Sequence, residues 1–361
     1  MLNFIKNLFK KKEEEIIEEP KQFGTGAFPD PEDENDYEYE PVLGGVSKPV
    51  DWEKGYDIEK ELDIIIPIKD QNGSSSCVGM GWSYYVGILD AVENGHYSET
   101  SAKAIYSQIF LKNGGAYLRD AAKLIVNWGS LREDFIPSYY VTGEAPNEAF
   151  MRELNWKNDK VDKIAEILKA KEYRKIRKAN YSMDTFAQAI RDNYGVVGGV
   201  SGSQDGKWSS MEPKPPVNGI DWGHCIYFGK FGIDEKGKYI STPNSWGNRD
   251  SGSLYPDGWQ KLREDYFKKE YMFNPWTLTD KPNSDLSKKL KVIIMNNEKK
   301  IIIEGEVPGR KGIIIDGYLR EIKDDTNNRS AAACLYVLAN NGFGQFVSKE
   351  DFDKIVKKQD F

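Results

Sequence analysis

The sequence has 361 residues, of which 39% are hydrophobic, and a formal net charge of −7. This length suits one large domain or two moderate ones. No segment approaches the ~18–20 apolar residues of a membrane-spanning helix, and the charge does not indicate a nucleic-acid-binding protein. The three cysteines fit neither a disulfide scaffold nor a metal motif, so we expect a reducing compartment and no bound metal.

Residues 1–49 are predicted to form an acidic, extended N-terminal tail. The first 50 residues contain 12 acidic and 6 basic side chains, a difference of −6, together with several prolines and glycines. Apolar residues at helical spacing in residues 2–11 indicate a short amphipathic helix, which either docks onto a surface or packs on the protein itself. Lys6 and Asn7 interrupt this short apolar stretch, which is therefore a poor secretory signal. We expect a cytoplasmic protein.

The folded part is predicted to be α+β, with helices first and strands after them. The segment Cys77–Asn94 has apolar residues every three or four positions, and Gly95 follows as a stop. Its three internal glycines are poor helix formers, which indicates close approach of a neighbouring element. Further helices are expected at 100–112, 118–128, 147–156, 160–176 and 183–191, and strands at 196–200, 225–231, 238–242 and 254–259.

The C-terminal region, residues 285–361, is predicted to be a small α+β accessory domain. It follows a link that contains Pro, Asn and Ser, and the main domain then covers residues 50–278. Strands are expected at 291–295, 300–304 and 312–317, and helices at 331–339 and 349–357.

Cys77 begins the first long predicted helix. A thiol at this position lies close to unpaired backbone N–H groups and to the positive end of the helix dipole. Both favour the thiolate, which is the form that attacks a carbonyl carbon. A lone cysteine is more often a buried structural residue, so catalysis by Cys77 requires partners.

Three further side chains would complete a catalytic site. The chain contains only two histidines, and His224 stands at the start of a predicted strand. Asn244 follows the next strand and can fix the tautomer of the imidazole, while Trp246 covers their hydrogen bond. Gln71 lies in the loop before the helix and can form an oxyanion hole with the backbone N–H of Cys77.

The chain resembles the papain family of cysteine peptidases between about residues 50 and 278. Residues 67–80 resemble the motif P-V-K-D-Q-G-x-C-G-S-C-W-A-F, Gly223-His224-Cys225 resembles G-H-A, and Asn244-Ser245-Trp246-Gly247 matches N-S-W-G. The loop Asn113-Gly114-Gly115 is similar to the family's N-G-G loop, whose backbone pairs with extended substrate. The resemblance implies a papain-like two-lobed fold, with Cys on a helical lobe and His and Asn on a β-barrel-like lobe.

The resemblance also implies site residues. Catalytic roles fall to Cys77, His224, Asn244 and Gln71, and substrate contacts to Gly114, Gly115, Trp246, Val197 and Cys225. Ser74 replaces a disulfide cysteine of the family, and the chain before Val50 is too short for the family's helical propeptide. The extended piece at 23–29 is then a candidate occupant of the cleft. The chain resembles a divergent bacterial or phage-like member, and a phage-encoded one would allow association with the virion.

Three functions stay open. The first is an endopeptidase that cleaves peptide bonds through a Cys77 thioester. The second is a Cys-His amidase acting on peptidoglycan or isopeptide bonds, and the third a non-catalytic binding or structural module. We expect a peptide or protein substrate and no cofactor. The basic run at 169–178 is interpreted as a solvated helix face and not as a nucleic-acid site.

Overall fold

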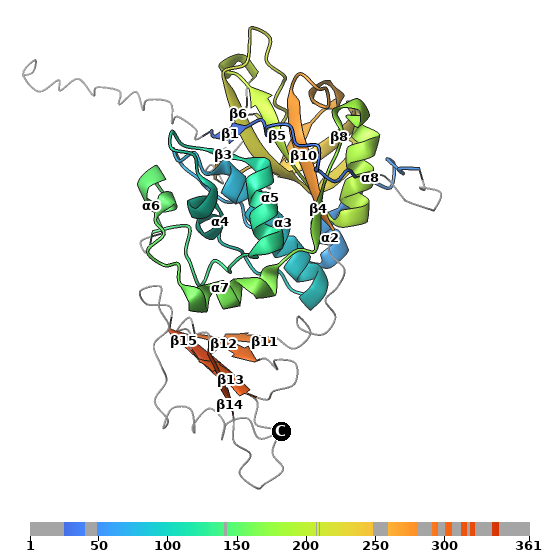
Figure 1. Ribbon diagram of the computed structural model, residues 1–361. Helices are drawn as coiled ribbons and strands as arrows, with labels where there is room; N and C mark the ends of the chain where they lie inside the picture. Colours follow the sequence, from blue (N-terminus) through green and yellow to red (C-terminus); the bar gives the residue numbers. More distant parts are fainter. Residues whose placement is uncertain are drawn as a thin grey trace, which may run out of the picture.

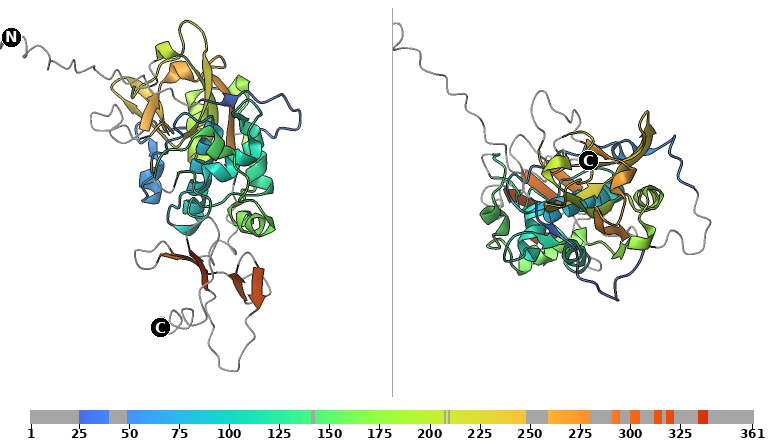
Figure 2. Two further views of the ribbon diagram at one scale, coloured as in Figure 1. Left: turned by 90° about the vertical axis from the view of Figure 1, so that its left-hand side faces the viewer. Right: turned by 90° about the horizontal axis from the view of Figure 1, so that it is seen from above.

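The computed structural model describes residues 25–39, 49–140, 143–206, 208, 210–247 and 259–279, and the backbone of five strands after residue 290. Up to residue 279, helices gather in one lobe and antiparallel strands in the other (Figure 1). The side view in Figure 2 shows the same division, with the teal and green helices below the yellow and orange strands. The α+β, two-lobed prediction is confirmed.

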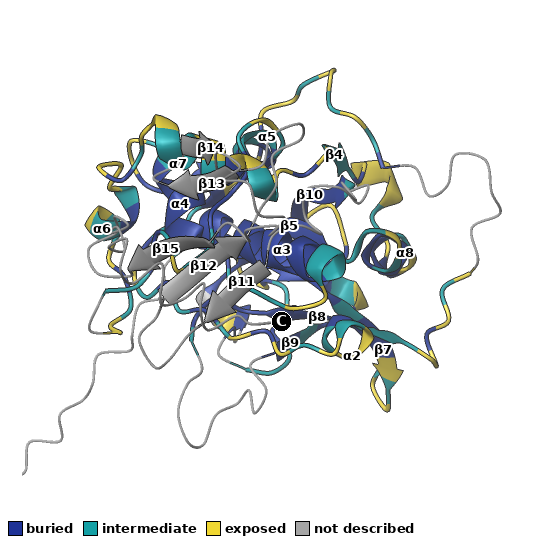
Figure 3. Cartoon of the chain, turned by 90° about the horizontal axis from the view of Figure 1, so that it is seen from below, coloured by how far each residue is buried: buried dark blue, intermediate teal, exposed yellow. Residues whose placement is uncertain are grey.

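The helical lobe is built around α3 (Cys77–Asn94), which is buried along most of its length (Figure 3). The other helices of this part are α2 (Ile58–Leu62), α4 (Ala102–Ile109), α5 (Leu118–Asn127), α6 (Glu148–Arg152) and α7 (Asp159–Ala165). Strand β1 (Ala27–Phe28) pairs in parallel with β3 (Ala116–Tyr117) beside this lobe.

The β-lobe contains two four-stranded antiparallel sheets. The first has the order β4 (Glu172–Lys175), β10 (Met272–Thr279), β5 (Val196–Gly202) and β6 (Trp222–Phe228). The second has the order β2 (Tyr56–Asp57), β7 (Lys230–Asp234), β8 (Gly237–Pro243) and β9 (Trp259–Leu262). Helix α8 (Met183–Asn193) packs against strands of both sheets.

The glycines of α3 allow two neighbours to approach it closely, as predicted. A methyl group built on Gly79 would lie 2.6 Å from the carbonyl oxygen of Ala102 at the start of α4. One built on Gly81 would lie 3.0 Å from the sulfur of Cys225 on β6. Because both distances are too short for ordinary contact, α4 and β6 can approach α3 this closely only because glycine has no side chain. This packing outweighs the poor helix propensity of glycine.

Two predictions in this region are wrong in detail. The predicted helix at 160–176 ends early, and its last part is the strand β4, which pairs with β10. Tyr173 of β4 packs edge-on against Trp276 of β10, with ring centroids 5.3 Å apart, so tertiary contacts override the helical pattern. The predicted strand at 225–231 is two strands, β6 and β7. The sequence patterns did not indicate β10. Of the strand expected at 254–259, only residue 259 lies within the described residues, and β9 begins there.

The C-terminal strands form two small antiparallel sheets. One contains β11 (Lys291–Ile294), β12 (Lys300–Glu304) and β15 (Cys334–Leu338), and the other β13 (Gly312–Ile315) and β14 (Tyr318–Glu321). The helix predicted at 331–339 is wrong, because residues 334–338 pair with β12. Aromatic and β-branched residues in this segment favour the strand. The helix expected at 349–357 and the segment 2–11 lie outside the described residues.

Candidate active site

Cys77 is the first residue of α3 and is completely buried. The loop before it is held by hydrogen bonds, because the hydroxyl of Ser74 donates to the carbonyl oxygen of Gln71 at 2.6 Å. The backbone N–H of Ser75 donates to a carboxylate oxygen of Glu148 at 2.6 Å. Ser74, at the position of a disulfide cysteine in the resembling family, thus stabilises this loop by hydrogen bonds.

His224 and Asn244 form the hydrogen bond that the sequence predicts. The Nε2 atom of His224, on β6, lies 2.9 Å from Oδ1 of Asn244, directly after β8. Nδ1 of His224 is buried and has no hydrogen-bond partner among the described residues. The backbone of Cys225 lies beside the sulfur of Cys77, so the strand that carries His224 runs next to the thiol. The free nitrogen is therefore available as a base.

Aromatic rings enclose the imidazole. Trp246 stacks on His224 with centroids 4.6 Å apart and an interplanar angle of 28°, as the predicted cover of the His–Asn hydrogen bond requires. Trp208 and Trp222 meet the imidazole edge-on at 6.2 and 6.4 Å. These rings exclude water from the hydrogen bond between His224 and Asn244, which strengthens it.

Gln71 is fully buried and fixed at both ends of its amide. Its Nε2 donates to the carbonyl oxygen of Ser74 at 2.9 Å, and its Oε1 accepts a hydrogen bond of 2.6 Å from the hydroxyl of Ser245. The backbone N–H of Gln71 also donates to the carbonyl oxygen of Ser245 at 2.8 Å. The loop before α3 is thereby joined to the residue after Asn244, although 173 positions separate Gln71 from Asn244 in the sequence.

Burial disfavours the charged forms of both the thiol and the imidazole. Burial raises the pKa of Cys77 to about 12, although backbone hydrogen bonds from Cys225, Val78 and Gly26 oppose this rise. Burial also lowers the pKa of His224 to about 4, against the opposing hydrogen bond from Asn244. The helix terminus was expected to favour a thiolate, and here desolvation outweighs that effect.

One segment that covers Cys77 is residues 25–39, which we name the N-terminal strap. The N–H of Gly26 donates to the carbonyl oxygen of Gly223 at 3.1 Å, and its carbonyl oxygen accepts from the N–H of Ala116 at 2.8 Å. The backbone of Gly26 also lies close enough to the sulfur of Cys77 to oppose the rise of its pKa. The strap therefore lies across Cys77, between the loop at 113–115 and β6. Of the piece 23–29 that the sequence suggested as an occupant of the cleft, residues 25–29 lie here, and residues 23 and 24 lie outside the described residues.

Three glycines make this close approach possible. A methyl group built on Gly26 would lie 2.4 Å from the carbonyl oxygen of Ser75. One built on Gly115 would lie 2.2 Å from the carbonyl oxygen of Gly26, and one on Gly223 would lie 2.3 Å from that of Ala27. Since all three neighbours are backbone atoms, none of the contacts can be relieved by a side-chain rotation.

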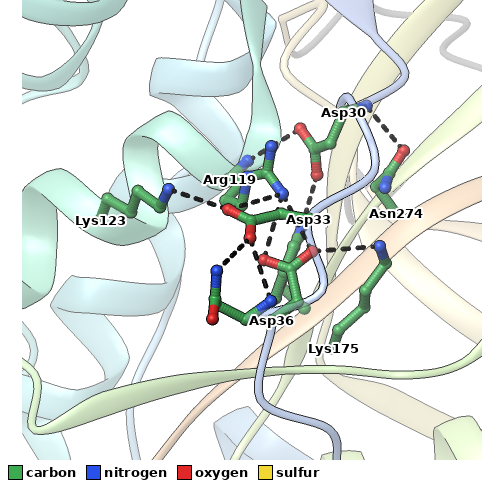
Figure 4. Close-up of polar contacts among 9 residues, drawn as sticks. Asp30, Asp33, Asp36, Arg119, Lys123, Lys175 and Asn274 are labelled. Atoms are coloured by element: carbon green, nitrogen blue, oxygen red, sulfur yellow. Dashed lines mark hydrogen bonds and ion pairs between the residues drawn. The ribbon is translucent and has the colours of Figure 1, made fainter.

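The acidic part of the strap is bound by cations of the folded domain (Figure 4). The guanidinium of Arg119, on α5, donates to both carboxylate oxygens of Asp36 at 3.2 and 3.0 Å. Lys175, on β4, lies 3.2 Å from Asp36, and Lys123 lies 3.7 Å from Asp33. Residues predicted to be an extended acidic tail are thus docked on both lobes, as the dark blue trace in Figure 1 shows.

Asp30 is the buried member of this group. Its carboxylate accepts hydrogen bonds from the indole N–H of Trp276 at 2.8 Å and from the backbone N–H of Arg119 at 3.0 Å. Its own N–H donates to Asn274 at 2.9 Å. Burial raises its pKa to about 6, although these hydrogen bonds oppose the rise. We name Asp30, Asp33 and Asp36 with their partners the acidic clasp.

Of the residues expected to contact substrate, two lie beside the strap and three are buried. Gly114 and Gly115 lie beside the strap, and both have positive φ, 93° and 74°. Val197 and Cys225 are buried in the core, at 0% and 1% exposure, and line no open surface here. Trp246, also buried, stacks on the imidazole. The substrate-binding roles of these five residues stay predictions.

Sequence reasoning missed two parts of the site. Gln260, on β9, accepts a hydrogen bond from the side-chain amide of Asn244 at 2.7 Å. A lone glutamine in a strand gives no signal of such a role. The clasp has a weak signal, because Asp30, Asp33 and Asp36 recur every third residue, but their partners are far away in the sequence.

Within the described residues, no cluster of His, Cys, Asp and Glu side chains could hold a metal ion. No described helix is long and apolar enough to cross a membrane.

Solved structures similar to this chain are cysteine proteases. Xylellain, a cysteine protease from Xylella fastidiosa, gives a TM-score of 0.56 at 18% identity, covering 74% of this chain and 99% of its own. Procathepsin B S9 from Trypanosoma congolense gives 0.54 at 12% identity, over 71% and 87%. Digestive procathepsin L 3 from the larval midgut of Tenebrio molitor gives 0.51 at 16% identity, over 71% and 75%. No protein-family model and no curated protein sequence matches the chain. The chain therefore has the papain-like fold.

Proposed function

We propose that this protein is a papain-type cysteine endopeptidase whose nucleophile is Cys77. The observation that carries the proposal is the pattern of hydrogen bonds around the imidazole of His224. Its Nε2 is held by Asn244, and its Nδ1 has no hydrogen-bond partner among the described residues. The next residue on the same strand, Cys225, lies beside the sulfur of Cys77. An imidazole that is oriented by an amide and stands on the strand beside a thiol is the constellation expected of a cysteine peptidase.

The catalytic cycle follows from these roles. Nδ1 of His224 takes the proton of the Cys77 thiol, and the sulfur attacks the carbonyl carbon of the scissile peptide bond. The side-chain N–H of Gln71 and the backbone N–H of Cys77 hold the oxyanion. His224 then returns the proton to the leaving amine, and a thioester remains on Cys77. Water, deprotonated by His224, attacks the thioester and releases the acid and the thiol.

We further propose that the chain is latent while the strap is docked. The sulfur of Cys77 is wholly buried, and its raised pKa leaves almost no thiolate near neutral pH. Two of the similar structures are named as pro-forms of cathepsins, which supports this interpretation. Substrate therefore gains access only after residues 25–39 leave the cleft.

The domain division is also proposed. Residues 50–278 would form the catalytic domain with residues 1–49 as its tail, and residues 285–361 an accessory domain whose described strands pair only with one another. Limited proteolysis of the full chain should leave a resistant fragment that contains both lobes. Cleavage first within either lobe would contradict this division.

The function is tested with a peptide library and a thiol-directed epoxide, both applied to the full chain and to its Gly26→Val variant, in which the strap cannot dock. Cleavage should accompany labelling of Cys77 alone, and Cys77→Ala should abolish both while leaving thermal unfolding unchanged. Cys225, which is also free and buried, is the internal control for labelling. Full turnover by Cys77→Ala would refute the mechanism. Cleavage of purified peptidoglycan fragments but of no peptide would favour the amidase instead.

A further inference from the structure

Gln260 is a buried glutamine directly behind the amide of Asn244. It lies on β9, opposite Thr242 of β8, and is completely buried. Its Oε1 accepts a hydrogen bond from Nδ2 of Asn244 at 2.7 Å. Its Nε2 donates to the backbone carbonyl oxygens of Trp208 and Ser210, both at 2.8 Å. Both ends of this side chain are therefore occupied.

The pattern of donors and acceptors fixes the orientation of both amides. A carboxamide can rotate by 180° and exchange its oxygen and nitrogen with little change in shape. The carbonyl oxygens of Trp208 and Ser210 only accept, so the nitrogen of Gln260 must face them. Its oxygen then faces Asn244 and accepts from the nitrogen there. The oxygen of Asn244 is thus left for His224.

We propose that Gln260 is a positioning residue that sets the tautomer of His224 through Asn244. With the oxygen of Asn244 fixed, Nε2 of His224 must carry the proton, and the lone pair of Nδ1 stays free. In the rotated amide, the nitrogen of Asn244 would face Nε2 and favour a proton on Nδ1, which could not act as a base. The catalytic meaning of this role rests on the proposed function, but the tautomer does not.

The tautomer matters because the imidazole is neutral. Burial lowers the pKa of His224 to about 4, so only one ring nitrogen carries a proton near neutral pH. A purely structural role for Gln260 would be to hold the segment around Trp208 against β9. The backbone already makes such a link, because the N–H of Lys261 donates to the carbonyl oxygen of Met211 at 2.8 Å.

The test is the ¹⁵N spectrum of the full chain with labelled histidine. The chain has two histidines, and exposed His96 serves as the internal reference. We expect His224 to be the Nε2–H tautomer in the parent chain. Gln260→Leu should shift the ratio of the tautomers of His224 toward Nδ1–H several-fold. Gln260→Glu, which keeps an acceptor for Asn244, should retain the parent tautomer.

A matched control is Gln188→Leu. Gln188 is another buried glutamine, on α8, and is bonded to Asp192 and Arg191. This change should leave the signals of His224 unchanged. An unchanged His224 spectrum in folded Gln260→Leu would overturn the proposal. If Gln260→Leu does not fold, Gln260→Met gives the same readout with a longer, more adaptable side chain.

A double-mutant cycle of Gln260→Leu with Asn244→Ala distinguishes a positioning role of Gln260 from a purely structural one. In the Gly26→Val chain, Gln260→Leu should lower the rate of Cys77 labelling at least tenfold, but have almost no effect when Asn244→Ala is already present. Equal effects in both backgrounds would indicate a merely structural role. If Cys77→Ala kept full turnover while the tautomer shifted as expected, the proposed function would fail and the positioning role would stand.

Discussion

The carbonyl oxygen of Gly26 accepts a hydrogen bond of 2.8 Å from the backbone N–H of Ala116. The pairing is parallel and continues through Ala27 and Phe28. It uses backbone groups next to Gly114 and Gly115, where the sequence predicts that substrate pairs. Access to Cys77 therefore depends on residues that take no part in the chemistry.

Gly26→Val should expel the strap from the cleft. A side chain at this position would lie within 2.4 to 2.9 Å of Ser75 and of the Gly115 backbone, and the backbone atoms among these cannot move aside. We expect labelling of Cys77 by the epoxide at pH 7 to accelerate at least tenfold, because exposure lowers the raised pKa of the thiol.

Glu32→Val is the control for this change. Glu32 lies in the same strap but is exposed. Its replacement should leave the labelling rate close to that of the parent chain. Equal rates for Gly26→Val and the parent chain would mean that the docked strap does not limit access.

Arg119→Met should weaken the acidic clasp. Arg119 is largely buried and donates twice to Asp36. Hydrogen bonds to charged groups contribute about 1.5–3 kcal/mol. Their loss corresponds to an increase of about 10- to 100-fold in the equilibrium constant for opening of the strap. Intact-mass kinetics of Cys77 labelling measure this opening.

Lys123→Met is the matched control for the clasp. Lys123 is 42% exposed at its side chain and lies 3.7 Å from Asp33, so solvent screens this pair and its contribution is small. A small change in labelling is expected. The interpretation of the clasp is wrong if the two variants label at the same rate.

Docking of the strap should weaken between pH 5 and 7. Burial raises the pKa of Asp30 from 3.8 to about 6, so the docked strap binds this proton more tightly than the released strap does. The contribution of Asp30 to docking is therefore fully present below pH 4 and is lost as the pH rises through 6. The pKa of Asp33 is lowered by hydrogen bonds from Asn35, so its opposite contribution changes only below this window.

Asp30→Asn removes this titration and serves as the reference. The ratio of labelling rates, parent chain over Asp30→Asn, should rise between pH 5 and 7, because any change in thiol reactivity itself is common to both chains. A ratio that stays constant over this range would exclude Asp30 as the titrating group.

Gln71→Leu should lower kcat about 10²–10³-fold with little change in KM, measured in the Gly26→Val chain. Loss of one oxyanion donor affects the transition state and not substrate binding. Ser245→Ala, which removes only the hydroxyl that holds Oε1 of Gln71, should have a smaller effect. If KM rose instead while kcat stayed the same, Gln71 would be a binding residue.

The sequence predicted the site better than the sheets around it. Helix α3 and the bond between His224 and Asn244 follow local signals, namely apolar periodicity and the N-S-W-G motif. Strand β4 was predicted as helix, because its identity depends on Tyr173 packing on Trp276, 103 residues later. Gln260 and the partners of the clasp were missed for the same reason. Their roles exist only after distant segments meet.

The proposed occlusion of Cys77 by a segment of the same chain has a consequence for any measured affinity. Strap and nucleophile belong to one chain, so dilution does not separate them, unlike two associated molecules. A substrate binds only the fraction of molecules whose strap has opened, and its apparent dissociation constant rises in inverse proportion to that fraction. Under the proposed function, the hydrogen bond between Gly26 and Ala116 thus helps to set the substrate concentration that the protein requires.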